Sequence, residues 1–367
     1  MSDTALAEAT SGAPTLRPDP TPYPHPPPRS DPAPRSDPAP RPSAAAPARP
    51  GHHRLVAGFA PCGHLHLGDY LGTIRPLTAL SRDTSGDVLA LLDGCPATAD
   101  PGEPDRTREH VRELAAALLA CGLGDRAELV ALSAVPAYAE LAQLLKSAAA
   151  TGTSRGNAPH GAPILLAAGI LAHRADAVPS GGDQHEHGEL ARTLARQINS
   201  RHGAVFTVPA RLALPDAVQV RDLREPTTAR GRPTTMTRPG GHGTGVLHLL
   251  DSPVRLAATV RRAVTDLDPV LGYDPELRPG VSNLAVILAA LTGRTPVAAL
   301  RGLRGAGALK AAVTEALVET LAPVRQRYAE LVADPAALDA VLTRGAESAA
   351  ERAEPALAAA RRALGAL

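Results

Sequence analysis

The sequence predicts an α/β fold in which a parallel sheet is flanked by helices, followed by a helical C-terminal domain. From residue 54 onward, short β-rich runs alternate with amphipathic helical runs. This alternation is typical of parallel sheets, because parallel strands are joined by crossover helices. Beyond residue 254, apolar residues recur at spacings of three and four, which is the pattern of packed helices.

Each element is predicted from a short stretch of sequence. Strands are expected where apolar residues form short runs, at 54–60, 87–93, 128–134, 176–181 and 218–223. Helices are expected where the apolar spacing is three or four, at 69–80, 108–122, 138–150, 163–175, 183–203 and 308–334. The stretch 224–245 is rich in Gly, Pro, Thr and Arg without periodicity, so we expect an exposed loop there.

The first 50 residues differ from the rest of the chain. They hold 15 of the 37 prolines, the near-repeat "RSDPAPRSDPAPRP" and almost no large apolar side chain. Such a segment cannot bury enough apolar surface to offset its chain entropy. We therefore predict a disordered leader over residues 1–50.

Composition narrows the classes of function. The net charge is +1, with 36 arginines against 2 lysines, which argues neither for nor against an RNA partner. Seven aromatic residues and no tryptophan argue against an aromatic stacking platform for single-stranded nucleic acid, and no DNA partner is predicted. Cys62, Cys95 and Cys121 have no paired spacing, and no early apolar signal or membrane-length run occurs. We expect a cytoplasmic protein without a membrane partner.

The stretch "GFAPCGHLHLGDYLG", residues 58–72, combines glycines and histidines where a strand is expected to turn into a helix. In parallel sheets, ligands bind beyond the carboxyl ends of the strands, where helix N-termini present N–H groups. Gly63 and Gly68 would let a nucleotide approach the backbone, and His64 and His66 could donate hydrogen bonds to phosphate. The alternative is a tight turn with surface histidines.

Four ordered blocks of the sequence resemble one family. "PCGHLHLGDYLG" resembles the HIGH-type signature of class I aminoacyl-tRNA synthetases, in the form typical of the tryptophanyl-tRNA synthetase family. "VPSGGDQHEHGELARTLARQIN", "RRAVTDLDP" and "YDPELRPGVSNLAVILAALTG" are similar to further segments of that family. The resemblance implies a Rossmann-like catalytic domain, a helical anticodon-binding domain and a homodimer. It also implies that ATP, with Mg²⁺, and tryptophan form an adenylate before transfer to tRNA.

The resemblance divides the chain into four parts. They are the disordered leader at 1–50, a Rossmann-like nucleotide-binding domain with a helical insertion at 51–223, a loop region that resembles the family's KMSKS loop at 224–253, and an anticodon-binding-like helical domain at 254–367.

The resemblance also transfers a nucleotide site to this sequence. His66, Gly68 and Asp69 match the positions that hold ATP, with Asp69 in place of the usual asparagine. Gly181 leaves room for the ribose, and the carboxylate of Asp183 accepts its hydroxyls. The full set expected to bind ATP is Ala60, Pro61, Cys62, Gly68, Asp69, Gly181, Gly182, Asp183, Gln184, Val220 and Thr235. The alternative is that these glycines serve only the turns of the fold.

The second signature of the family, K-M-S-K-S, is altered. Its lysines neutralise the pyrophosphate in the transition state. Here an insertion precedes the counterpart "TMTRP", in which Thr235 replaces the first lysine, Met236 is kept and Arg238 replaces the second lysine. A guanidinium also binds phosphate, so His66, Met236 and Arg238 are the predicted catalytic residues. Arg230 or Arg232 in the insertion is a candidate for the missing cation, and the alternative is a solvated surface arginine.

The expected amino-acid pocket differs most from the family. In "APILLAAGIL", Ala162, Leu166 and Gly169 stand where the family has tyrosine, methionine and an aspartate that accepts the indole N–H. An unpaired buried N–H costs about 1 to 3 kcal/mol. Val56, Ala60 and Cys95 replace phenylalanine, glutamine and histidine, and a family segment is missing between Arg155 and Pro163. The predicted substrate-binding residues are Val56, Ala162, Leu166, Gly169 and Val178.

Three functions remain open from the sequence. The first is a tryptophanyl-tRNA synthetase. The second is a divergent enzyme that adenylates another carboxylic acid and passes it to tRNA or to a non-tRNA acceptor. The third is a catalytically impaired pseudo-synthetase that binds nucleotide, RNA or protein. Pyrophosphate exchange with a panel of acids distinguishes them.

Overall fold

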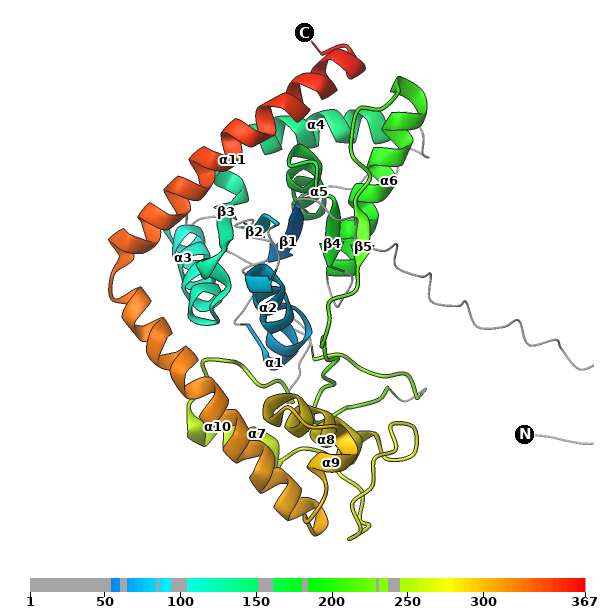
Figure 1. Cartoon of the computed structure of the whole chain (residues 1–367), viewed down its shortest axis with the longest axis vertical. Helices are drawn as coiled ribbons and strands as arrows, with labels where there is room; N and C mark the ends of the chain where they lie inside the picture. Colours follow the sequence, from blue (N-terminus) through cyan, green and yellow to red (C-terminus); the bar gives the residue numbers. More distant parts are fainter. Residues whose placement is uncertain are drawn as a thin grey trace, which may run out of the picture. The chain divides into compact units, whose positions relative to one another are not determined.

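A computed structural model describes residues 54–59, 65–83, 86–93, 104–150, 161–179, 184–228, 231–236 and 245–366. Its centre is a sheet of five parallel strands in the order β3-β2-β1-β4-β5 (Figure 1). The strands are β1 (Leu55–Phe59), β2 (Val88–Leu92), β3 (Ala127–Ala131), β4 (Ala177–Pro179) and β5 (Ala210–Leu212). The predicted α/β fold with a parallel sheet is confirmed.

Helices connect the strands and form the C-terminal part. Those between the strands are α1 (Leu67–Asp69), which continues through a π-helical turn (Tyr70–Ile74) into α2 (Arg75–Asp83), then α3 (Pro104–Ala120), α4 (Pro136–Ala150), α5 (Ala162–Ala172) and α6 (Gln184–His202). Those that follow are α7 (Pro253–Arg261), α8 (Pro279–Thr292), α9 (Pro296–Ala299), α10 (Gly305–Val332) and α11 (Pro335–Leu364). Proline begins α7, α8, α9 and α11, because its missing N–H has no partner to lose at a helix start.

The two faces of the sheet bury alternate residues of each strand. In β1, Leu55, Ala57 and Phe59 belong to a core cluster with α2, α3 and α7 to α10. Val56 belongs instead to the cluster that contains α4, α5, α6 and part of α11. Because successive side chains of a strand point to opposite faces, this division places helices on both faces, as a buried parallel sheet requires.

The last helix, α11, covers the edge strand β3 (Figure 1). The contact is close at Gly345, where an added Cβ would collide with the carbonyl of Leu129. Ala349, Ala353 and Leu357 continue the same buried side of the helix. An exposed edge strand invites pairing with other chains, so α11 protects the sheet edge as well as adding core.

One predicted strand is wrong and one strand was missed. Residues 218–223 alternate valine with polar residues, yet they form no strand. Their backbone N–H groups donate to partners outside the sheet. Val218 N–H donates to Leu71 O, Arg221 N–H donates to Asn283 Oδ1, and Leu223 N–H donates to Gly245 O. The fifth strand is β5, which pairs with β4 through Ala177 and Ala210.

Several predictions fall outside the described residues or remain untested. The leader at 1–50 lies outside them, and the four domain boundaries remain predictions. The loop predicted at 224–245 has no regular helix or strand in its described residues, and most of these are exposed. Across the described part of the chain, no helix combines the length and the apolar character needed to span a bilayer.

Candidate functional site

The histidine predicted to hold ATP begins the first helix after β1. His66 is 5% exposed and is the N-cap of α1. Its Nδ1 accepts the N–H of Asp69 (3.1 Å), and its own N–H donates to Asp69 Oδ2 (3.0 Å). This reciprocal capping box satisfies N–H groups that the helix start leaves without partners. The turn therefore holds the imidazole in one orientation.

The capping bond also determines which ring nitrogen carries the proton. In a neutral imidazole one nitrogen accepts and the other donates. Because Nδ1 of His66 accepts the N–H of Asp69, the proton of the neutral ring lies on Nε2. Nε2 of His66 is then a hydrogen-bond donor of the kind that binds phosphate oxygens.

Gly68 lies where the HIGH-type stretch at 58–72 contacts the counterpart of the KMSKS loop at Met236. A Cβ at Gly68 would lie 3.1 Å from the His66 ring and 3.5 Å from Cβ of Met236. Met236 is 4% exposed, and its N–H donates to the carbonyl of Val220 (3.0 Å). Four residues predicted for the site therefore lie close together at the start of α1, after β1: His66, Gly68, Val220 and Met236. Asp69 contacts His66 through the capping box.

A segment that the sequence analysis did not assign to the site forms another wall. Leu247 N–H donates to the sulfur of Met236 (3.4 Å), and Leu67 N–H donates to Leu247 O (2.8 Å). His66 and His248 form an isolated antiparallel bridge. Because these contacts join positions far apart in the chain, no local sequence pattern predicts them.

The insertion before Met236 folds back on itself. Thr227 and Pro233 form an antiparallel bridge. Thr228 N–H donates to Arg232 O (2.7 Å), and Arg232 N–H donates to Thr228 Oγ1 (3.1 Å). Arg232 and Thr235 are both exposed. The turn therefore presents the Arg232 side chain to solvent, while buried Met236 holds the end of this segment in the core.

The predicted acid-binding residues lie in a closely packed apolar region. Val56, Leu166 and Val178 are at most 2% exposed and belong to one core cluster. A Cβ at Gly169 would lie 2.7 Å from Leu91 Cδ1 and 3.2 Å from Leu132 Cδ2. A Cβ at Gly58 of β1 would collide with the side chain of Leu166. Leucine methyl groups thus face the position where the family has its aspartate.

Other predicted site residues lie outside the described part of the chain. They are Ala60, Pro61, Cys62, Gly63, His64, Cys95, Gly181, Gly182, Asp183, Arg230 and Arg238. Ala162 begins α5 and Gln184 begins α6. The start of α6 follows β4 in the chain, and the role predicted for Asp183 between them stays a prediction.

Comparison with known proteins gives concordant matches. The family model of tRNA synthetases class I (W and Y) matches residues 49–155 and 163–322. Tryptophan–tRNA ligase 1 of Streptomyces coelicolor is 38% identical over 334 residues, which cover 86% of this chain and 97% of that protein.

Solved structures show the same fold. A tryptophanyl-tRNA synthetase from Mycoplasma pneumoniae has a TM-score of 0.73 at 24% identity and covers 85% of this chain and 98% of its own. One from Campylobacter jejuni, complexed with ADP and tryptophan, has a TM-score of 0.65 at 23% identity and covers 85% and 99%. The sequence matches carry the assignment, and the structures agree with it: the chain belongs to the class I tRNA synthetases (W and Y), as a member of the tryptophanyl-tRNA synthetase family.

Proposed function

We propose that this protein uses ATP to form an aminoacyl adenylate and transfers the aminoacyl group to tRNA. The observation that carries the proposal is the convergence of His66, Gly68 and Met236 beside β1 in a chain of this family. A Cβ at Gly68 would lie 3.1 Å from the His66 ring, so glycine lets the imidazole keep the orientation in which Nε2 can donate to phosphate. These residues fit a bound nucleotide.

Different described residues are proposed to contact different parts of ATP. ATP supplies the adenylyl group and the pyrophosphate leaving group. Nε2 of His66 donates to a phosphate oxygen, and the capping bond from Asp69 to Nδ1 keeps the ring aimed (3.1 Å). Val220 lines the adenine side, and its carbonyl fixes Met236 (3.0 Å). Mg²⁺ bound to the phosphates would neutralise part of their charge.

Tryptophan is the first acid to test, because the relatives named above are tryptophan–tRNA ligases. A second candidate function is adenylation of a different acid. It is favoured by the packing of Leu91 and Leu132 methyl groups around Gly169, the position at which the family has the aspartate that accepts the indole N–H. Leaving that N–H unpaired disfavours tryptophan by about 1 to 3 kcal/mol.

Pyrophosphate exchange with a panel of amino and aryl acids, with and without tRNA, tests the proposal. Exchange with tryptophan supports the first candidate, and exchange only with another acid supports the second. His66→Ala should lower exchange by roughly a hundredfold or more, since loss of one donor to a developing charge has that effect. His202→Ala, at an exposed position on α6, is the control. Absence of exchange with every acid, together with absence of ATP binding, overturns the proposal.

The resemblance also implies a homodimer, and we propose that this chain forms one. Sedimentation velocity on the full chain should give twice the monomer mass. A monomer at all concentrations would contradict it.

A further inference from the structure

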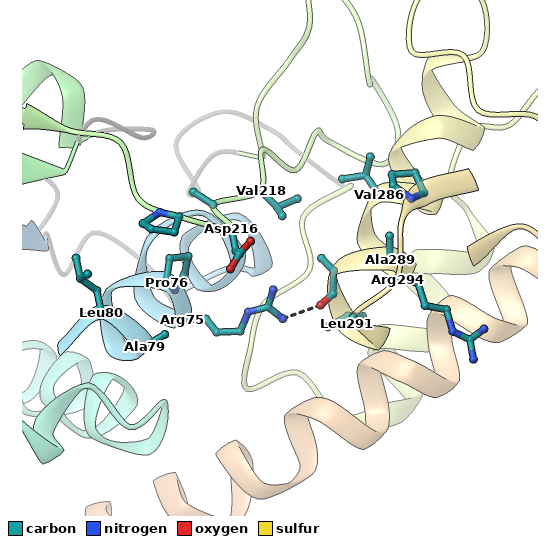
Figure 2. Close-up of a pocket in the computed structure, with 15 residues that line it drawn as sticks. Arg75, Pro76, Ala79, Leu80, Asp216, Val218, Val286, Ala289, Leu291 and Arg294 are labelled. Carbon is teal, nitrogen blue, oxygen red and sulfur yellow. Dashed lines mark hydrogen bonds between the residues drawn. The ribbon is translucent and has the colours of Figure 1, made fainter. Parts of the chain in front are cut away.

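A cavity of about 820 Å³ lies between α2 and the C-terminal half of α8, and residues 215–218 form a third wall (Figure 2). Its volume falls in the range of small-molecule sites, roughly 300 to 1,000 Å³. None of the residues predicted for ATP or for the amino acid lines it.

Two guanidinium groups belong to the lining. Arg75 extends from α2 into the cavity and donates Nη1–H to the carbonyl of Ala290 on α8 (2.7 Å) (Figure 2). Among the described residues this guanidinium makes no second hydrogen bond, although it has five N–H groups. Arg294 lies beyond the end of α8 and is exposed. The cavity therefore offers N–H donors and positive charge to an acidic group.

The rest of the lining is largely apolar and suits a hydrocarbon body. The apolar side chains in it include Pro76, Leu80, Pro215, Val218, Val286 and Leu291. Apolar walls with a few convergent polar groups are the usual composition of a site for small organic ligands. A bare inorganic anion would leave these walls unused.

Asp216 adds an acceptor to the same cavity. Its φ of 56° is in the left-handed region, which residues other than glycine adopt rarely and at a cost. Figure 2 shows its carboxylate on the side of Arg75. A ligand between them would need a hydrogen-bond donor as well as an acid, since a carboxylate repels a simple anion.

One wall of the cavity, residues 215–218, contacts the turn that leads away from the proposed nucleotide site. Val218 N–H donates to Leu71 O (3.1 Å), and a Cβ at Gly72 would lie 3.3 Å from Val218 O. Leu71 and Gly72 lie in the π-helical turn that follows α1, and the carbonyl of Val220 accepts the N–H of Met236. A ligand that displaces residues 215–218 would therefore shift both Val220 and the turn after His66.

We propose that this cavity binds a small amphipathic organic acid that carries a hydrogen-bond donor, and that its occupancy changes the affinity for ATP. The acid group pairs with Arg75, the donor with Asp216, and the apolar body with the walls. The proposal that the acid binds depends only on the cavity, whereas the proposed effect on ATP affinity rests on the proposed function.

The probe is 8-anilinonaphthalene-1-sulfonate, which combines a sulfonate, an N–H and two aromatic systems and fluoresces when bound. The full chain should bind one equivalent saturably. Arg75→Leu removes the cation, and Ala79→Phe fills the cavity from an exposed position of α2; each should weaken binding at least tenfold. Arg301→Leu and Ala336→Phe, both at exposed positions outside the lining, are matched controls and should bind as the unaltered chain does.

Calorimetric titration of ATP with and without the saturating probe measures the coupling. The dissociation constant for ATP should change at least threefold, and ATP should change probe affinity by the same factor. The cavity site is overturned if Arg75→Leu and Ala79→Phe leave probe binding unaffected. It is also overturned if ATP simply displaces the probe from both variants, because the probe would then occupy the nucleotide site. An unchanged ATP affinity overturns the coupling. If ATP does not bind at all while the two variants still lose the probe, the proposed function fails and the cavity site stands.

Discussion

Gly68 faces the imidazole of His66 so closely that a Cβ at residue 68 would lie 3.1 Å from both Nδ1 and Cε1 of the ring. Gly68→Ala should therefore tilt the His66 ring away from its capped orientation. We expect the rate of pyrophosphate exchange to fall roughly ten- to a hundredfold, because small misplacements of a positioned group have effects of that size. The unfolding midpoint should change little.

The control for this change is Gly307→Ala. Gly307 lies in α10, and a Cβ there would meet no atom within 4 Å, so exchange should be unaltered. Equal exchange rates for Gly68→Ala and the unaltered chain would contradict the assigned role of the His66 ring.

Gly169→Asp tests whether the family's aspartate can simply be restored. The atoms nearest to the new Cβ are methyl groups of Leu91 and Leu132 rather than a charged group. An unpaired charge in an apolar region destabilises a protein by about 3 kcal/mol or more. We expect a lower free energy of unfolding in urea and no gain of tryptophan-dependent exchange.

Gly169→Ala separates charge from volume at this position. Its Cβ would lie 2.7 Å from Leu91 Cδ1, at the flexible end of that side chain, so its cost is that of overpacking, about 1 to 3 kcal/mol. If the two variants are equally stable, the region accommodates a carboxylate, and the argument against an indole N–H acceptor at this position fails.

His173 and Tyr138 form a buried hydrogen-bonded pair that makes stability depend on pH. Nε2 of His173 bonds to the Tyr138 hydroxyl, and His173 is fully buried. Burial, with the nearby positive charge of Arg54, lowers the pKa of His173 to about 4. Burial also raises the pKa of Tyr138 above its ordinary range, so both groups are neutral at pH 7.

The sign of the pH effect follows from the lowered pKa. The unfolded chain binds a proton on residue 173 near the ordinary pKa of about 6.5, whereas the folded chain does so only near 4. The stabilisation is therefore complete above pH 6.5 and is lost as the pH falls from 6.5 to 4, by about 3 kcal/mol in total. Urea unfolding at several pH values measures it. His173→Gln removes the titration, and parallel pH profiles for this variant and the unaltered chain would contradict the assignment.

The sequence predicted the elements whose signals are local. β1 to β3 are short buried runs of the kind that only a sheet covered on both faces produces, and the long apolar spacing of α10 predicted its helix. The proximity of His66, Gly68 and Met236 followed from the resemblance, which carries information about register that composition lacks.

The sequence did not predict features that depend on distant partners. β5 has three residues, two of them exposed, and thus no alternation to detect. Residues 218–223 look like a strand, but Arg221 exchanges hydrogen bonds with the side chain of Asn283, 62 positions away. The cavity beside Arg75 likewise exists only because α8 lies opposite α2.

Gly345 in α11 provides the last test, because glycine normally weakens a helix interior. By helix propensity alone, Gly345→Ala should stabilise the protein by up to about 1 kcal/mol. The added Cβ would collide with the carbonyl of Leu129 in β3, so the helix must move away from the sheet edge. We expect net destabilisation of about 1 to 3 kcal/mol in urea unfolding and faster amide exchange along β3. Gly307→Ala, with open space around its Cβ, should change stability in the opposite direction. If both changes stabilise the protein, α11 does not depend on close contact at Gly345 to cover the edge strand.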